Sequence, residues 1–186
     1  MTQSAPWHLD DGGLLPAAVY IPSPNFDDRP HGSVIDLLVV HNISLPPGQF
    51  GGPGIVELFT NRLDPNTHPY YRQIADAKVS SHFLVRRDGE LLQFVPGSRR
   101  AWHAGKSEWR GRGRCNDFSV GVELEGTDDL AFADSQYATL GRLATVLLKS
   151  YPIRDCVGHS DIAIPPGRKT DPGPHFDWPR FRSLIG

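Results

Sequence analysis

The sequence is short of the features that mark several large classes of protein. Its 186 residues include two cysteines, Cys115 and Cys156, which allow one disulfide at most. No apolar run approaches the roughly 20 residues that a membrane-spanning helix needs. Neither sign of charge is in large excess, since 19 Lys and Arg residues stand against 21 Asp and Glu residues and leave a net charge of −2. The chain therefore lacks the basic excess usual in nucleic-acid-binding proteins, and we expect neither a nucleic-acid partner nor a membrane.

The N-terminal segment also lacks the marks of an export signal. Residues 1–15 contain no Lys or Arg and are interrupted by Asp10 and Asp11, whereas a secretory signal has a basic start and an uninterrupted apolar stretch. We therefore expect a cytoplasmic protein whose two thiols stay reduced.

Length and composition predict one globular domain over residues 1–186. The length falls in the range of roughly 100–200 residues usual for a domain. Hydrophobic residues make up 39% of the chain and charged residues 22%, which is ordinary for a folded globule. We expect a monomer, because no exposed apolar helix face requires a partner.

Apolar patterns predict an α/β (α+β) domain with a central mixed β-sheet flanked by helices. The apolar run 34–41 is typical of a strand buried on both faces. The alternation over 118–124 indicates another strand, with Glu123 and Glu125 on one face. A hairpin is expected over 81–95, with Asp88-Gly89 in a type I′ turn. Helices are expected near 55–62, at 133–151 with Asp134 or Ser135 as cap, and at 177–185 with Asp177 as cap and Pro179 in the first turn.

Polar side chains follow apolar segments at three places. His41 comes directly after one predicted strand, His159 follows the short apolar piece Cys156-Val157, and Asp171 lies in a charged stretch bounded by prolines. Two imidazoles and one carboxylate leave a fourth position for water, as in catalytic zinc sites. Spacing alone leaves the alternative of loop-capping or solvated histidines open. Asp161, two residues after His159, could be a ligand or could instead cap a loop or orient an imidazole.

Six short motifs, read together, are more specific than any of these residues alone. They closely resemble those of the AmpD family of N-acetylmuramoyl-L-alanine amidases, part of a zinc-amidase superfamily that includes phage T7-type lysozymes and peptidoglycan recognition proteins. The resemblance runs from about Ser23 to Ile185. In chain order the motifs are Val39-Val40-His41-Asn42-Ile43-Ser44, Trp102-His103-Ala104-Gly105, Cys115-Asn116-Asp117-Phe118-Ser119, Gly121-Val122-Glu123-Leu124-Glu125-Gly126, Gly158-His159-Ser160-Asp161-Ile162-Ala163 and Arg168-Lys169-Thr170-Asp171-Pro172-Gly173.

The resemblance implies a fold, a reaction and a set of site residues. It implies one zinc ion per chain, held by His41, His159 and Asp171, with Glu123 as the catalytic carboxylate and Lys169 as the catalytic lysine. The bond cleaved would be the amide between the lactyl group of 1,6-anhydro-N-acetylmuramic acid and L-alanine, during cytoplasmic cell-wall recycling. The small muropeptide is then the expected partner.

These residue types suit such chemistry. Zinc lowers the pKa of a bound water from 15.7 toward about 7. Glu123 could take the proton of that water and pass it to the departing amine, and Lys169 could stabilise the oxyanion of the intermediate. Glu125 shares the strand face of Glu123 and is the alternative base, although the family pattern favours Glu123.

Residues around the substrate are also implied by the resemblance. Arg114 offers a forked pair of donors that suits a stem-peptide carboxylate. Lys78 stands where the family often has Arg, and the loop 162–169 is longer than usual for the family. The implied substrate-binding residues are Asn42, Trp102, His103, Arg114 and Asn116.

Three other functions compete with this interpretation. One is an amidase acting on intact murein, although no wall-binding repeat is visible. Another is a muropeptide-binding module without catalysis, which typically lacks a metal ligand. The last is a cysteine hydrolase that uses Cys115 with His103, although no strand–helix turn presents the thiol as a nucleophile.

Overall fold

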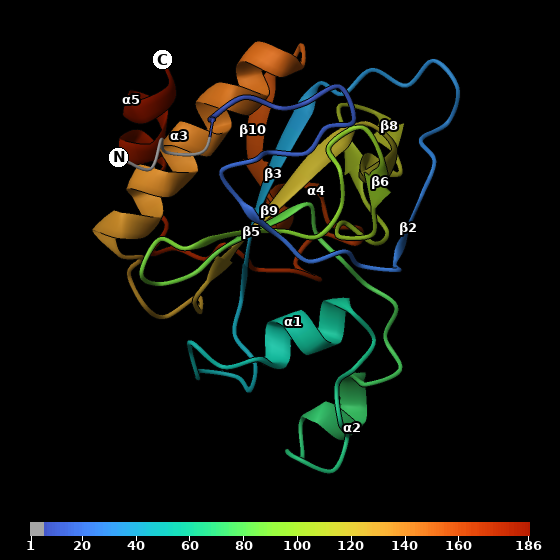
Figure 1. The fold of residues 1–186 in the computed structure, drawn as a ribbon, viewed down its shortest axis with the longest axis vertical. Helices are drawn as coiled ribbons and strands as arrows, with labels where there is room; N and C mark the ends of the chain where they lie inside the picture. The colour runs from blue at the N-terminus through green and yellow to red at the C-terminus, as the bar shows by residue number, and fades with distance from the viewer. Residues whose placement is uncertain (1–5) are drawn as a thin grey trace.

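A six-stranded mixed sheet forms the centre of the computed structural model, which describes residues 6–186 (Figure 1). The first five residues of the segment considered for an export signal thus lie outside the described residues. Neighbouring strands are parallel except for the antiparallel pair β4–β5. The strand order is β1 (Val19–Tyr20), β5 (Leu91–Gln93), β4 (Phe83–Val85), β9 (Ser119–Glu125), β3 (Leu37–Ile43) and β10 (Asp155–Gly158).

The predicted strands are present with adjusted ends. β3 begins three residues later than expected and continues past His41, and it lies between β9 and β10 as a buried central strand should. The hairpin is confirmed, but the type I′ turn is wrong. That turn needs positive φ at both central residues, whereas in this turn Gly89 alone has it, at +91°. The N–H of Gly89 donates to the carbonyl of Arg86 at 2.9 Å, so the glycine closes the turn.

Two helices cover one face of the sheet. α3 (Asp134–Ser150) and α5 (Trp178–Ile185) lie side by side there (Figure 1, orange and red). The cap of α5 by Asp177 is confirmed, since its carboxylate accepts the N–H of Arg180. The cap expected for α3 is wrong: Ala133 is its N-cap residue, and the Gln136 side chain accepts the N–H of Ala133. The core on this face includes Leu38, Val40, Val120, Val122, Leu140, Leu143, Leu147 and Phe181, whose burial contributes roughly 1.5–3 kcal/mol per large side chain.

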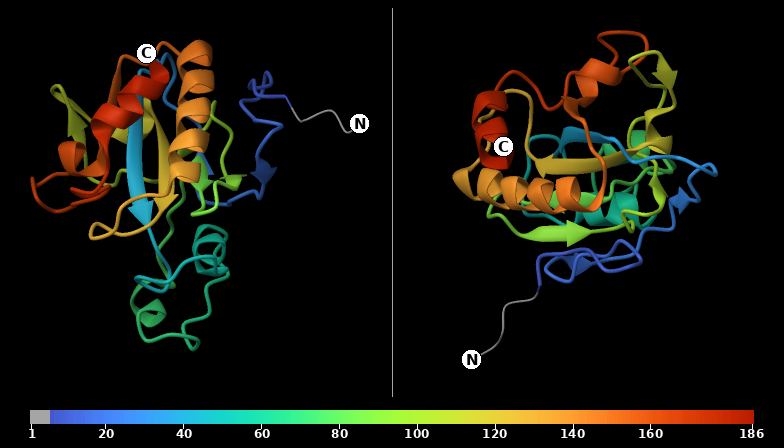
Figure 2. Two further views of the ribbon diagram at one scale, coloured as in Figure 1. Left: turned by 90° about the vertical axis from the view of Figure 1, so that its left-hand side faces the viewer. Right: turned by 90° about the horizontal axis from the view of Figure 1, so that it is seen from above.

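Shorter elements pack against the other face of the sheet and beyond the carboxyl end of β3. α1 (Gly54–Phe59) and α2 (Tyr71–Ile74) lie past the end to which the β3 arrow points (Figure 2, left). They share a second apolar cluster with β4 and β5. η1 (Cys115–Asp117) and α4 (His159–Ile162) pack near β3 and β10 in a third cluster.

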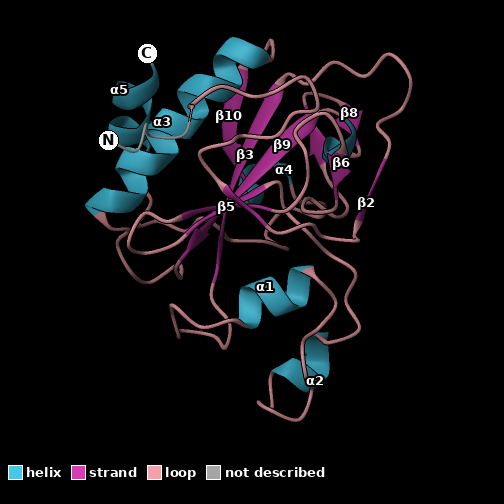
Figure 3. Ribbon diagram, in the orientation of Figure 1, coloured by secondary structure: helices cyan, strands magenta, loops and turns pink. Residues whose placement is uncertain are grey.

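Two small antiparallel pairs complete the fold (Figure 3). They are β2 (Phe26–Asp27) with β6 (Arg100–Ala101), and β7 (Glu108–Trp109) with β8 (Arg112–Gly113). The predicted class, a mixed sheet flanked by helices, is confirmed. Within residues 6–186, none of the helices is both long enough and apolar enough to cross a membrane.

Candidate active site

A cleft of about 590 Å³ opens at the carboxyl ends of β3 and β9. Its polar side contains His41, Glu123 and His159, together with the stretch from Arg168 to Asp171. Its apolar side is formed by the α1–α2 region, where Leu58, Phe59, Tyr70 and Ile74 line it. Parallel strands end at the same edge of a sheet, which is why polar residues distant in sequence meet there.

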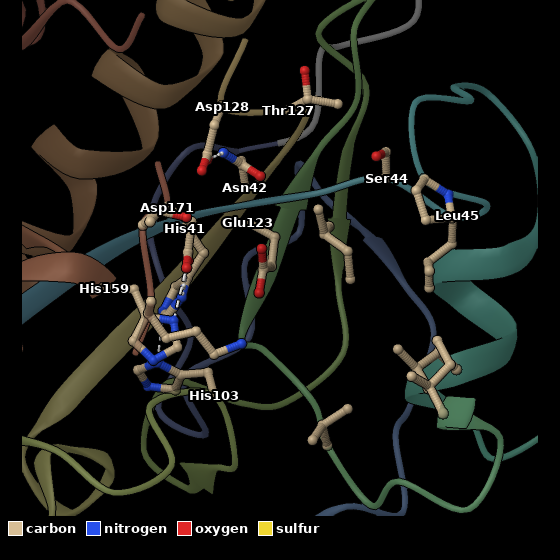
Figure 4. A pocket seen from close by; sticks show the side chains of 18 of the residues that line it. His41, Asn42, Ser44, Leu45, His103, Glu123, Thr127, Asp128, His159 and Asp171 are labelled. Atoms are coloured by element: carbon tan, nitrogen blue, oxygen red, sulfur yellow. Dashed lines mark hydrogen bonds and ion pairs between the residues drawn. The ribbon is translucent and has the colours of Figure 1, made fainter. Parts of the chain in front are cut away.

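His41, His159 and Asp171 converge in this cleft, with Glu123 beside them (Figure 4). One ligand atom from each of the three lies within 4.8 Å of the others. Oδ2 of Asp171 is 3.1 Å from Nδ1 of His41 and 3.1 Å from Nδ1 of His159. The sequence therefore identified three residues that the fold brings together.

Strand pairing places the two imidazoles next to each other. Gly158 at the end of β10 lies opposite Val40 of β3, so His159 follows beside His41. The N–H of Ser160 donates to the carbonyl of Asp171 at 2.9 Å, which fastens the last loop to the start of α4. Both imidazoles are buried, and burial lowers the pKa of His41 to about 4.

The outer nitrogen of each imidazole also has a partner. Nε2 of His41 lies 2.9 Å from Nδ1 of His103, and Nε2 of His159 lies 3.2 Å from the carbonyl oxygen of Ala104. The nitrogens that face Asp171 are thus Nδ1 in both residues.

Glu123 lies directly opposite His41 in the β3–β9 register. Its side chain is buried, and its Oε2 has no hydrogen-bond partner among residues 6–186. Burial, and secondarily the negative charge of Asp171, raise the pKa of Glu123 well above its ordinary value, while Lys169 opposes this shift. An unpartnered carboxylate with a raised pKa in a cleft is typical of a residue that transfers protons.

Glu125 has a different environment on the same face of β9. Its Oε1 accepts the N–H of Gly51 at 2.7 Å and pairs with Arg86 at 3.1 Å, and its Oε2 accepts the N–H of Arg87. Both oxygens are therefore occupied in holding two loops. The contacts support Glu123 over Glu125 as the carboxylate available for chemistry.

Lys169 and Asp161 are exposed, but only Lys169 lines the cleft. Oδ2 of Asp161 accepts the N–H of Gly158 at 2.7 Å and so caps the start of α4. Asp161 is absent from the converging set of ligand atoms among the described residues.

The residues expected to bind substrate are divided between two places. Asn42, Trp102 and His103 line the cleft, whereas Arg114 and Asn116 are outside its lining within residues 6–186. Arg114 is exposed and pairs with Asp117. Oδ1 of Asn116 accepts the backbone N–H groups of His103 and Ala104. Substrate contact by these five residues stays a prediction.

Some residues of the site were not predicted from the sequence, because their place depends on contacts with distant segments. Asp128 lines the cleft and accepts a hydrogen bond from Asn42 at 2.7 Å. The apolar side formed by α1 and α2 was not predicted either, since the sequence indicated only a short helix near 55–62. Ser119 was passed over although it closes the Cys115–Ser119 motif. Cys115 itself is fully buried, and burial raises the pKa of its thiol, so it has the properties of a structural cysteine.

Comparisons with known proteins agree with this geometry. The model of the N-acetylmuramoyl-L-alanine amidase family matches residues 31–174. The 1,6-anhydro-N-acetylmuramyl-L-alanine amidase AmpD of Salmonella typhimurium (strain SL1344) is 58% identical over 179 residues, which are 95% of each chain. A crystal structure of a selenomethionine AmpD derivative has 57% identity and a TM-score of 0.92, and the match covers 96% of this chain and 99% of that one.

A more distant relative has been solved with a ligand. The N-acetylmuramyl-L-alanine amidase AmiD of Escherichia coli, in complex with the substrate anhydro-N-acetylmuramic acid-L-Ala-D-γ-Glu-L-Lys, is 27% identical. It has a TM-score of 0.61, and the match covers 86% of this chain and 65% of that one. The family model matches most of the chain, and AmpD aligns with it over nearly the whole length. This protein therefore belongs to the N-acetylmuramoyl-L-alanine amidase family, on its AmpD branch, and is an amide-hydrolysing enzyme.

Proposed function

We propose that this enzyme is a zinc-dependent amidase that releases stem peptides from 1,6-anhydro-N-acetylmuramyl peptides. The bond broken is the amide between the lactyl group of the sugar and L-alanine. The observation that carries the proposal is the unpartnered carboxylate oxygen Oε2 of Glu123 beside the converging His41, His159 and Asp171. Two relatives support the substrate, since AmpD is named for this activity and AmiD was solved with such a ligand.

The donor set fits zinc. Two imidazole nitrogens and one carboxylate oxygen are ligands that zinc prefers, and three protein ligands are usual in catalytic rather than structural sites. The three donor atoms lie close enough together to share one ion. His41, His159 and Asp171 would hold the metal. When bound, zinc lowers the pKa of water from 15.7 toward about 7 and so supplies a nucleophile at neutral pH.

Glu123 moves the proton in this proposal. Its carboxylate accepts the proton of the attacking water and donates it to the alanine nitrogen as the carbon–nitrogen bond breaks, so the proton lost by water is gained by the leaving amine. The raised pKa of Glu123 suits this double role, because the carboxyl group then accepts and holds a proton more readily than an ordinary glutamate does.

Lys169 supplies positive charge where the oxyanion forms. It is exposed within the cleft wall, two residues before Asp171, so its ammonium group can reach a substrate carbonyl without being buried beforehand. A single donor of this kind is typically worth about 3–4 kcal/mol of transition-state stabilisation.

Hydrolysis of purified anhydro-N-acetylmuramyl tripeptide tests the proposal. We expect peptide release by zinc-loaded enzyme, loss of release after chelation, recovery with zinc, and loss in Glu123→Ala. Full activity after verified zinc removal would contradict the metal mechanism. Faster turnover of intact sacculi than of the soluble tripeptide would instead favour an amidase acting on murein, and saturable binding without cleavage would favour a recognition module.

The proposed setting is the cytoplasmic recycling of cell-wall fragments, by a monomer. This follows the family resemblance. Cell fractionation followed by the tripeptide assay tests the location, and gel filtration of the purified enzyme tests the oligomeric state.

A further inference from the structure

The proton transfer and metal binding of the proposed reaction use no residue of two motifs, yet these motifs meet beside the site. The motif 102–105 contains His103, and the motif 115–119 ends with Ser119. Nδ1 of His103 lies 2.9 Å from Nε2 of His41, and Nε2 of His103 lies 3.2 Å from Oγ of Ser119. Oγ of Ser119 lies 2.6 Å from the carbonyl oxygen of Cys115. These four residues are all buried, and Figure 4 shows His103 on the side of His41 away from Asp171.

The direction of each hydrogen bond in this chain follows from its last member. A carbonyl oxygen can only accept, so the hydroxyl of Ser119 donates to Cys115. Oγ of Ser119 is then free to accept the Nε2–H of His103. That leaves Nδ1 of neutral His103 with a lone pair, which accepts Nε2–H from His41. His41 therefore presents the lone pair of Nδ1 toward Asp171.

The turn at 102–105 also fixes which ring nitrogen of His159 carries the proton. Its Nε2–H donates to the carbonyl of Ala104, the residue after His103, so its Nδ1 also faces Asp171 with a lone pair. Two imidazole lone pairs and a carboxylate oxygen thus converge. Only a cation, whether a proton or a metal ion, can be shared among three acceptors.

The position of the His103 ring is itself tightly set. Oδ1 of Asn116 accepts the backbone N–H of His103 and of Ala104 at 3.2 and 2.8 Å. A Cβ atom built on Gly121 would lie 2.5 Å from Cγ of His103, so the ring packs against the backbone of β9 where only glycine leaves room. The motif 115–119 thus holds the turn at 102–105 through Asn116 and the His103 ring through Ser119.

We propose that His103, oriented by Ser119, is a positioning residue that fixes the tautomer and direction of His41 so that Nδ1 faces the metal. The role toward metal rests on the proposed function, whereas the hydrogen-bond directions do not. Groups that hold a metal-binding histidine by its other nitrogen commonly change metal affinity about 10–100-fold when removed.

His82 provides a matched control for loss of a buried imidazole. Its ring is fully buried and its centroid is 5.6 Å from that of His103. Its Nδ1 accepts the N–H of Gly121 at 3.0 Å, and its Nε2–H donates to the carbonyl of Arg99 at 3.0 Å. Neither of these hydrogen bonds involves His41, His159 or Asp171.

Long-range ¹H–¹⁵N spectra of the histidine rings test the hydrogen-bond directions. In metal-free and zinc-loaded protein we expect His103 to carry its proton on Nε2 and to leave Nδ1 unprotonated. Ser119→Ala removes the acceptor of that proton, so His103 should become a mixture of tautomers. A proton on Nδ1 of His103 in the native protein would overturn the proposal. These spectra report the tautomers whether or not the protein hydrolyses any substrate.

Zinc affinity, measured by competition with a chromophoric chelator, tests the consequence. We expect His103→Leu to bind zinc about 10–100-fold more weakly, His103→Asn to recover most of the loss through its side-chain oxygen, and His82→Leu to stay near wild type. If His103→Leu and His82→Leu weaken zinc affinity equally, the effect of His103 is one of general packing and the proposal is overturned. If His103→Leu does not fold, Ser119→Ala gives the same comparison, with a several-fold loss expected. Failure of the native protein to bind zinc would contradict the proposed function alone.

Discussion

Replacing Glu123 by glutamine is expected to stabilise the metal-free protein at pH 8. The carboxylate is buried and Oε2 has no hydrogen-bond partner among the described residues, so its negative charge is poorly compensated in the folded state. An unsatisfied buried polar group costs about 1–3 kcal/mol, and more when charged. Because the neutral amide introduced by Glu123→Gln also stays partly unsatisfied, we expect a gain of about 1–2 kcal/mol. At roughly 2–4 °C per kcal/mol for a domain of this size, Tm should rise by about 2–8 °C.

The gain should depend on pH in a defined direction. Burial raises the pKa of Glu123 above its ordinary value of 4.5, so between that pH and the raised pKa the folded state holds a proton that the unfolded chain has lost. Stability therefore falls as pH rises through this window, and the cost is greatest above it. The advantage of Glu123→Gln should be large at pH 8 and nearly absent at pH 4. Thermal unfolding of chelated protein at the two pH values measures it.

Glu125→Gln is the matched control on the same strand face. Glu125 is also buried, but its carboxylate accepts two backbone N–H groups and pairs with Arg86. Loss of hydrogen bonds to a charged group costs about 1.5–3 kcal/mol, so this variant should be destabilised at pH 8. If Glu123→Gln is neutral or destabilised at pH 8 in chelated protein, the interpretation of Glu123 as an uncompensated charge is refuted.

Other predictions follow from particular contacts. Lys169→Ala should lower kcat about 10²–10³-fold and leave Tm almost unchanged, since Lys169 is exposed. Steady-state kinetics and melting curves measure the two effects. An unchanged kcat would contradict the role of Lys169 in stabilising the oxyanion. Iodoacetamide at pH 7 should leave activity intact, because burial raises the pKa of both thiols, that of Cys156 to about 11; rapid inactivation would revive the cysteine hydrolase. Leu143→Ala, on the buried face of α3, should cost about 2–5 kcal/mol of unfolding free energy without weakening zinc binding. Urea unfolding and chelator competition would show both.

The sequence was most informative where a polar residue follows an apolar strand. His41 and His159 were identifiable because each ends a short apolar run, and parallel strands bring such ends to one edge. The fold class followed from the same patterns. Asp171 was noticed in a charged stretch bounded by prolines, but favouring it as a ligand needed the family resemblance, because nothing local marks a ligand supplied by a loop.

What the sequence could not decide depends on contacts between distant segments. Strand period places Glu123 and Glu125 on one face and cannot separate them. They differ because Gly51 and Arg86, from two other segments, reach only Glu125. The turn at Gly89 was wrongly assigned because Asp-Gly also suits a turn with positive φ at the glycine alone. The apolar wall of α1 and α2 depends on tertiary packing and has no local signature.

The dispersal of the converging residues along the chain has a thermodynamic consequence. His41 and Asp171 are 130 positions apart, and His159 is 12 positions from Asp171. An unfolded chain therefore offers no compact group of ligands, so zinc should have little affinity for the unfolded state. Zinc bound at the proposed site would then act as a ligand selective for the native state, and linkage would give a stabilisation of about 2.7 kcal/mol at a free concentration of 100 times Kd. Zinc availability would then set the resistance of the enzyme to unfolding as well as its rate of hydrolysis.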